Sequence, residues 1–208
     1  MLRKITQRFC IPLLALCASL VSQAQQKNEV GLVIGATTTP DVSLSSGQNL
    51  PYDSSLALGA EYDRRLTPGN TALYAGVDFL ASPLDVKLSH RLAGISPQYA
   101  YIFLTPHVRL KFNSNGALRP WLLFGGGYTR FSASATGLPS GFRGGSNTGN
   151  VEFGGGVDTA PLVHLLGVGI GGRIEVRDFY SGTPNFGVPV ISGRQNTIAY
   201  TGGLLLRF

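Results

Sequence analysis

Apolar and polar residues alternate along most of the chain from residue 29 onward, with the period of two that indicates β-strands with two different faces. In the last stretch, for example, Ile198, Tyr200, Leu204, Leu206 and Phe208 share one face of the expected strand. The pattern predicts eight strands, most of them near the roughly 9–11 residues that a tilted membrane strand needs. They cover residues 29–38, 55–66, 71–79, 100–112, 119–131, 151–158, 164–179 and 197–208.

Short and long connections alternate between these strands. The short ones carry Pro, Gly and Asn where tight turns favour them, and they cover residues 66–70, 113–118 and 159–163. The long ones are rich in Ser, Gly, Pro and Thr, and they cover residues 39–53, 81–97, 133–149 and 179–194. Outer-membrane barrels have short periplasmic turns and longer outer loops. The alternation therefore predicts an all-β, eight-stranded, antiparallel, up-and-down transmembrane β-barrel, with a soluble β-sandwich as the alternative.

One face of the expected strands carries equal numbers of acidic and basic residues. They are Glu61, Asp63, Asp78, Glu152, Asp158 and Glu175, with Arg65, Arg109, Lys111, Arg173, Arg177 and Arg207. Neutrality suits an enclosed lumen, because an unpaired buried charge is costly. We therefore predict that these twelve residues form a structural charge network inside the barrel. A solvated sheet face with unrelated charges is the alternative.

The opposite face of the expected strands is almost free of charge. Its exceptions, Arg64 and Asp178, fall at strand ends, where the penalty for a charge in lipid is small. Aromatic residues near strand ends are typical of the girdles at the two membrane interfaces. The candidates for such girdles are Tyr62, Tyr128, Tyr200 and Phe208.

The first residues have the layout of a secretory signal peptide. Arg3, Lys4 and Arg8 precede the apolar stretch 9–21, and small residues lead up to Ala24. We expect cleavage after Ala24, which leaves residues 25–208 as a single outer-membrane β-barrel domain.

Removal of this segment changes the chemistry that remains available. Both cysteines, Cys10 and Cys17, leave with it, so disulfides and thiolate metal sites are not expected. The formal charge falls from +6 to +3, because three basic residues lie in the segment, and a nucleic-acid function loses most of its support. The three histidines, His90, His107 and His164, lack the spacing of metal ligands. No cofactor is expected.

The signal peptide, the eight strands, the alternating connections and the terminal GGLLLRF together resemble the outer-membrane β-barrel domain family. Its small eight-stranded members are typified by the OmpA transmembrane domain and OmpX. The resemblance implies a location in the outer membrane, among lipids and lipopolysaccharide. It also implies an assembly signal for the barrel-assembly machinery, formed here by Tyr200, Leu204, Leu206 and Phe208. Because the sequence ends with the eighth strand, we expect no peptidoglycan-binding domain.

Little in the sequence points to catalysis. Barrels similar to lipid A deacylases carry a His-x-Ser pair, whereas none of the three histidines here lies two residues before a serine. We expect His107 to form a hydrogen bond in the lumen. No catalytic residue is predicted.

An open pore is also not expected. Eight strands leave an interior that side chains just fill, and the charged residues would fill it further. Inward aromatic residues are expected to add to this plug, namely Tyr74, Tyr99, Tyr101, Phe103 and Trp121. The sequence thus favours a structural or surface-interaction role through the four long connections, with an unknown surface partner. Arg143 and Arg194 are either contacts for lipopolysaccharide phosphates or ordinary solvated charges. A narrow pore for small solutes and a lipid-modifying barrel enzyme remain the alternative functions.

Overall fold

The computed structural model describes residues 27–39, 42–43, 49–50, 54–87, 98–134, 145–183 and 193–208. Its long strands are β1 (Asn28–Thr38), β4 (Ser55–Arg65), β5 (Ala72–Lys87), β6 (Gln98–Lys111), β7 (Leu118–Ser134), β8 (Gly145–Thr159), β10 (Val168–Gly182) and β11 (Arg194–Arg207). Three short strands accompany them, namely β2 (Val42–Ser43), β3 (Asn49–Leu50) and β9 (Val163–Leu165). The described part of the chain holds no helix long and apolar enough to cross a membrane.

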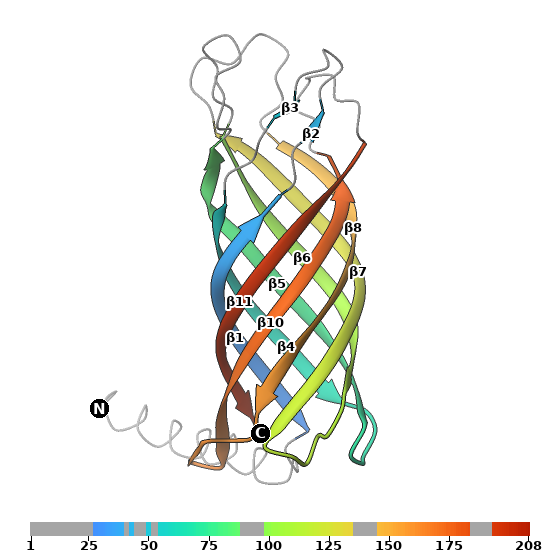
Figure 1. Ribbon diagram of the computed structural model, residues 1–208, viewed down its shortest axis with the longest axis vertical. Helices are drawn as coiled ribbons and strands as arrows, with labels where there is room; N and C mark the ends of the chain where they lie inside the picture. The colour runs from blue at the N-terminus through green and yellow to red at the C-terminus, as the bar shows by residue number, and fades with distance from the viewer. Residues whose placement is uncertain are drawn as a thin grey trace, which may run out of the picture.

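The eight long strands form a closed barrel in which each strand is antiparallel to its neighbours. The ladder runs from β1 through β4, β5, β6, β7, β8 and β10 to β11, and β11 pairs back onto β1 (Figure 1). Closure lets strands satisfy their backbone N–H and C=O groups on both sides, which is the condition for spanning lipid. The predicted fold class is confirmed, and each of the eight predicted strands is present.

The closing seam lies between the first and last strands. Asn28 donates its N–H to the Phe208 carbonyl over 2.9 Å, and Phe208 returns an N–H bond to Asn28 over 3.0 Å. These bonds hold the C-terminal residue in place. In Figure 1 the C-terminus lies at the end of the barrel opposite β2 and β3. Because neighbouring strands are antiparallel, all four long connections leave from that opposite end.

Several strands extend further toward the long connections than the sequence pattern indicates. β5 runs to Lys87 and β8 begins at Gly145, although 81–97 and 133–149 were predicted as loops. In residues 145–150 polar or small side chains occupy both faces, so the apolar alternation ends while the ladder continues. The β5–β6 pairing also shifts register between Ser82 and Val86, an interval that contains Pro83, which has no N–H to donate.

The third short connection differs from the prediction as well. Instead of turning at 159–163, the chain continues into β9, which forms a hairpin with β10. The turn consists of Leu166 and Gly167, both with positive φ (52° and 84°), as a two-residue type I′ turn requires. The prediction that Leu166 lies in a strand was therefore wrong, and its side chain is 93% exposed. Leucine rarely adopts positive φ, so the sequence carries no clear signal for this turn.

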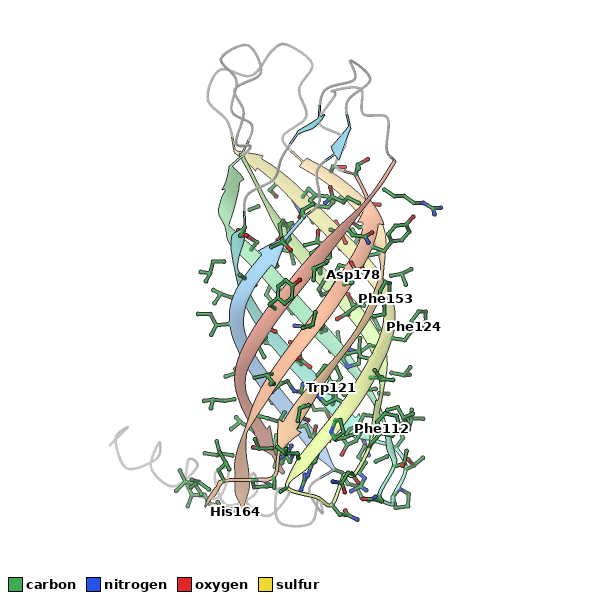
Figure 2. The ribbon with its side chains drawn as sticks, in the orientation of Figure 1. Phe112, Trp121, Phe124, Phe153, His164 and Asp178 are labelled. Atoms are coloured by element: carbon green, nitrogen blue, oxygen red, sulfur yellow. The ribbon has the colours of Figure 1, made fainter. Side chains whose placement is uncertain are left out.

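The outward face of the barrel is largely apolar, as a lipid-facing surface must be, and Arg64, Arg130 and Asp178 are charged residues on it. Phe124 is 61% exposed and stands on the outside of the wall, whereas Trp121, 2% exposed, lies within it (Figure 2). Two of the predicted girdle residues bond to neighbouring strands: Tyr62 donates to Asn28 and Tyr128 donates to Asn147. Tyr200, by contrast, lies near the middle of β11, because that strand begins at Arg194, before the predicted start.

An apolar layer fills the lumen toward the end with the long connections. It consists of Ala57, Leu80, Tyr101, Phe103, Phe131, Phe179 and Ala199. Phe103 stacks on Phe179 with ring centroids 4.3 Å apart, and Tyr101 meets Phe103 edge-on at 5.3 Å. Each of these three rings is at most 2% exposed.

Two glycines let the closing strands approach each other. A Cβ atom added to Gly35 would lie 1.9 Å from the Tyr200 carbonyl oxygen, and one added to Gly203 would lie 1.9 Å from that of Leu32. No side chain fits at either position without moving the backbone. The seam between β1 and β11 therefore requires glycine there.

The variant Gly203→Ala tests this constraint. Overpacking a fitted site costs about 1–3 kcal/mol, so we expect a loss of that order in the free energy of unfolding. Urea titration of the refolded protein in detergent, with heat-modifiable electrophoretic mobility as the folding assay, measures it. Gly126→Ala is the matched control, because its Cβ would meet the Asn150 oxygen at an ordinary 3.6 Å. Equal stability of the two variants would show that close approach at the seam is not limiting.

Candidate functional site

Alternate residues of seven strands deliver ionisable side chains to the interior of the barrel. Each of these side chains is at most 5% exposed. They are Glu29, Glu61, Asp63, Asp78, His107, Arg109, Lys111, Glu152, Asp158, Arg173, Glu175, Arg177 and Arg207. Since inward positions recur every second residue, the strands place them in successive layers along the barrel.

The middle layer is built around two arginines. Arg109 forms ion pairs with both Glu61 and Asp63. Arg173 reaches Glu61 through Nη1 at 2.6 Å and Asp158 through Nε at 2.7 Å. Each guanidinium thus bridges two carboxylates, and Glu61 joins the two arginines into one network.

Trp121 lies between these cations and an acid. The Arg109 guanidinium carbon is 4.2 Å from the centre of the indole ring, and that of Arg173 is 5.1 Å away. The indole Nε1 donates to Asp158 Oδ1 over 3.0 Å. Cation–π attraction and this hydrogen bond both fix the ring, and the rigid ring in turn holds the arginines in position.

Toward the chain termini, the next layer is centred on Lys111. Its Nζ lies 2.6 Å from Glu29 Oε2 and 2.6 Å from Asp158 Oδ2. Glu29 Oε1 accepts a bond from Arg207 Nε over 3.0 Å, and Arg207 Nη1 donates to the Thr159 carbonyl over 2.8 Å. Glu29 and Arg207 belong to the two strands of the seam, so this layer also helps to close the barrel.

The layer beneath the aromatic cluster has one cation for three carboxylates. Arg177 contacts Asp78 at 2.5 Å, Glu175 at 2.8 Å and Glu152 at 3.3 Å. Thr201 donates its hydroxyl to Glu175 Oε1 over 2.6 Å. This layer therefore has more acidic than basic side chains.

Small residues in the wall make room for these long side chains. A Cβ at Gly76 would lie 2.4 Å from Asp63 Oδ1, and one at Gly156 would lie 2.6 Å from the Trp121 ring. His107 Nε2 donates a hydrogen bond to Asp63 Oδ1 over 2.8 Å. The glycine-rich strands and the charged strands are thus complementary parts of one packed interior.

Eleven of the twelve residues predicted for the network are buried inside the barrel. The remaining one, Arg65, is half-buried near the termini and donates to the carbonyls of Thr67 and Gly69 instead of pairing with an acid. The sequence analysis missed Glu29 and Arg119. Both are the first residues of predicted strands and occupy inward positions, so assigning faces from the first residue of each strand would have found them.

His107 and His164 are the two histidines that the structure describes, and they lie in different surroundings. Within the described residues, no group of three or more His, Cys, Asp or Glu side chains is arranged to hold a metal ion. His107 is part of the lumen network, His164 is exposed on β9 (Figure 2), and His90 and Arg143 lie outside the described residues. Of the aromatic residues predicted to point inward, Tyr74, Tyr101, Phe103 and Trp121 are buried. The side chain of Tyr99 is not among those described.

Comparisons with known proteins identify the fold. No family model and no curated protein sequence matches the chain. Among solved structures, Neisserial surface protein A (NspA) is similar over 88% of this chain and 98% of its own, with 14% identity and a TM-score of 0.54. The outer membrane enzyme PagL aligns over 86% and 98% of the two chains, with 17% identity and a TM-score of 0.46. OprG from Pseudomonas aeruginosa aligns over 88% and 96%, with 16% identity and a TM-score of 0.43.

The protein thus has the fold of the small eight-stranded outer-membrane barrels. At such low sequence identity the likeness shows the fold alone. What the lumen can do chemically follows from its contacts, which hold buried charges in a network of ion pairs and hydrogen bonds.

The variant Arg173→Met tests the energetic role of the network. Removing one partner of a buried ion pair costs about 3–5 kcal/mol, because Glu61 and Asp158 would each lose a cation. Urea unfolding in lipid vesicles, followed by the fluorescence of Trp121, the only tryptophan of the chain, measures this loss. Arg130→Met, which removes an exposed arginine of β7, is expected to change stability by less than about 0.5 kcal/mol. Similar losses in the two variants would contradict the role of the ion pairs.

Proposed function

We propose that the protein is an outer-membrane barrel with a structural or surface-interaction role, and that its lumen is a plug. The observation that carries this proposal is the filling of the interior by paired charges beneath a layer of aromatic rings. A barrel built in this way offers no continuous water-filled path. The function of the protein then depends on its outer surface and on the four long connections that the barrel carries at one end.

A membrane location is supported by three independent features. The barrel is closed, its outward side chains are largely apolar around the whole ring, and residues 1–24 have the pattern of a cleaved signal peptide. The surrounding partners are then lipids, with lipopolysaccharide in the outer leaflet. Arg194 is exposed at the end of the long connections and lies over the Tyr180 ring at 5.4 Å, where it suits a phosphate group of that leaflet.

The outer face of β11 supports a role in assembly. Tyr200 and Leu204 are exposed there, and Leu206 and Phe208 are half-buried at the end of the seam. Before β11 pairs with β1, this apolar edge is available to the barrel-assembly machinery. Phe208 is therefore proposed as the last residue of the assembly signal.

No catalytic role is proposed for His107. Its side chain is buried in the lumen and engages Asp63, whereas a lipid substrate would approach from the opposite side of the wall. The long connections remain the proposed interaction sites. They join β1 to β4, β5 to β6, β7 to β8 and β10 to β11, all at one end of the barrel.

Cysteine labelling in intact cells tests this orientation. Ser140→Cys in the β7–β8 connection is expected to react with a membrane-impermeant maleimide. Asn115→Cys in the short β6–β7 turn is the matched control and is expected to react only after lysis. The reverse pattern would place the long connections in the periplasm and exclude a surface role.

Ion flux distinguishes a plug from a pore. We expect wild-type protein, refolded in vesicles, to conduct ions no faster than vesicles without protein. The double variant Phe103→Ala/Phe179→Ala removes the stacked pair and shows whether the aromatic layer limits conductance. Regular stepwise conductance of the wild type in planar bilayers would instead support a narrow pore for small solutes.

A further inference from the structure

A cavity of about 330 Å³ lies at the end of the barrel where β1 begins and β11 ends. It lies beyond the Lys111 layer, and its lining combines cations with hydroxyl and amide groups. The residues that line it are Glu29, Arg65, Tyr74, Ser114, Asn115, Arg119 and Arg207. Asn115 is exposed and Arg65 and Arg119 are half-buried, so the cavity opens toward the short turns.

The charges around this cavity are unequal. Three arginines face one carboxylate, and both oxygens of that carboxylate are already engaged. Glu29 Oε1 accepts from Arg207 Nε at 3.0 Å, and Glu29 Oε2 pairs with Lys111 Nζ at 2.6 Å. Among the ion pairs of the described residues, none includes Arg65 or Arg119. Two positive charges are therefore left without a contacting acid.

Neutral acceptors hold these two arginines in place without cancelling their charge. Arg65 donates through Nε to the Thr67 carbonyl at 3.0 Å and through Nη2 to the Gly69 carbonyl at 2.7 Å. Arg119 donates through Nε to the Gly116 carbonyl at 3.0 Å. The carbonyls belong to the short turns, so the turns fix the guanidinium groups at the rim. Fixed cations lose little freedom on binding a ligand, which favours affinity.

A third donor is available at the inner wall of the cavity. Arg207 is only 1% exposed, and its Nη2 has no hydrogen-bond partner within the described part of the chain. Asp158 Oδ2 is 3.8 Å from this Nη2 atom, which is too long for a hydrogen bond. A buried donor without an acceptor carries a desolvation cost that a ligand oxygen would remove.

From this geometry we propose that the cavity is an anion-binding site for a small ligand that carries a phosphate group. Guanidinium groups bind phosphate oxygens through paired N–H donors, and three of them surround one space here. The volume lies at the lower end of the range of about 300–1,000 Å³ for ligand pockets, which suits a compact ligand. The site is separate from the proposed surface role, because it lies at the opposite end of the barrel.

Calorimetric titration with inorganic phosphate tests the proposal on the refolded full-length barrel in a zwitterionic detergent. Ionic strength is held constant by replacing chloride with phosphate, since screening alone weakens exposed charge pairs. We expect saturable binding at one site. Arg119→Gln is expected to weaken the affinity about tenfold or more, which corresponds to the loss of one charge-assisted hydrogen bond.

Arg130→Gln is the matched control, because it removes one arginine from the same strand at the opposite end of the barrel. Its affinity for phosphate is expected to equal that of the wild type. Heat-modifiable mobility confirms that each variant is folded, and Arg65→Gln provides a second test with the same expected loss. Absence of saturable binding, or equal affinity of Arg119→Gln and Arg130→Gln, would overturn the proposal.

Two further arms distinguish the sources of the phosphate group. Glycerol 3-phosphate stands for a soluble metabolite and is titrated in the same way. The barrel is also inserted into vesicles with or without phosphatidylglycerol. If a lipid headgroup occupies the site, phosphatidylglycerol lowers the apparent affinity for inorganic phosphate, and Arg119→Gln abolishes this competition. If the ligand is soluble, the affinity for inorganic phosphate is the same in vesicles with and without phosphatidylglycerol. The proposal then holds for a soluble phosphate compound.

Discussion

Ion pairing inside the barrel is the interaction on which the rest of the structure depends. The buried ionisable side chains of the lumen are at most 5% exposed, so they have to find partners in the protein. Adding Glu29 and Arg119 to the twelve predicted residues gives seven acids and seven bases on the inward side, among the strand residues whose side chains are described. These equal numbers of acids and bases are not evenly distributed along the lumen, however. Acid is in excess around Arg177, and base is in excess near Arg65 and Arg119.

This network also explains the composition of the wall. Arginine, lysine and tryptophan side chains are long, and a wall of eight strands leaves little space for them. Glycine at the facing positions, such as Gly76 and Gly156, supplies that space. The glycine-rich stretches are therefore packing elements of regular strands and not flexible linkers. The low overall charge of the chain has a related cause, because the outward half of each strand has to remain apolar for lipid.

Much of the fold follows from the sequence, because a period of two and an alternation of loop lengths are properties of local sequence. Alternation also assigns each side chain to the lumen or to the outside, as for Glu61 or Arg173. It does not tell which charges meet, since Arg173 pairs with Glu61 across the barrel as a result of strand tilt and stagger. The turn at Leu166 and the interaction of Arg65 with carbonyl groups were missed for a similar reason. Both depend on backbone geometry that has no marker in the residue types.

The seam between β1 and β11 has a consequence for the order of events during synthesis. The ion pair of Glu29 with Arg207 joins residues 178 positions apart, and the bonds between Asn28 and Phe208 join positions still further apart. Contacts of such high sequence separation form slowly, because a long loop has to close before they contribute any stability. The edge of β1 that does not pair with β4 thus remains open until β11 has been made. A chain without β11 could build most of its wall but could not close it, and the open edge would be a template for aggregation.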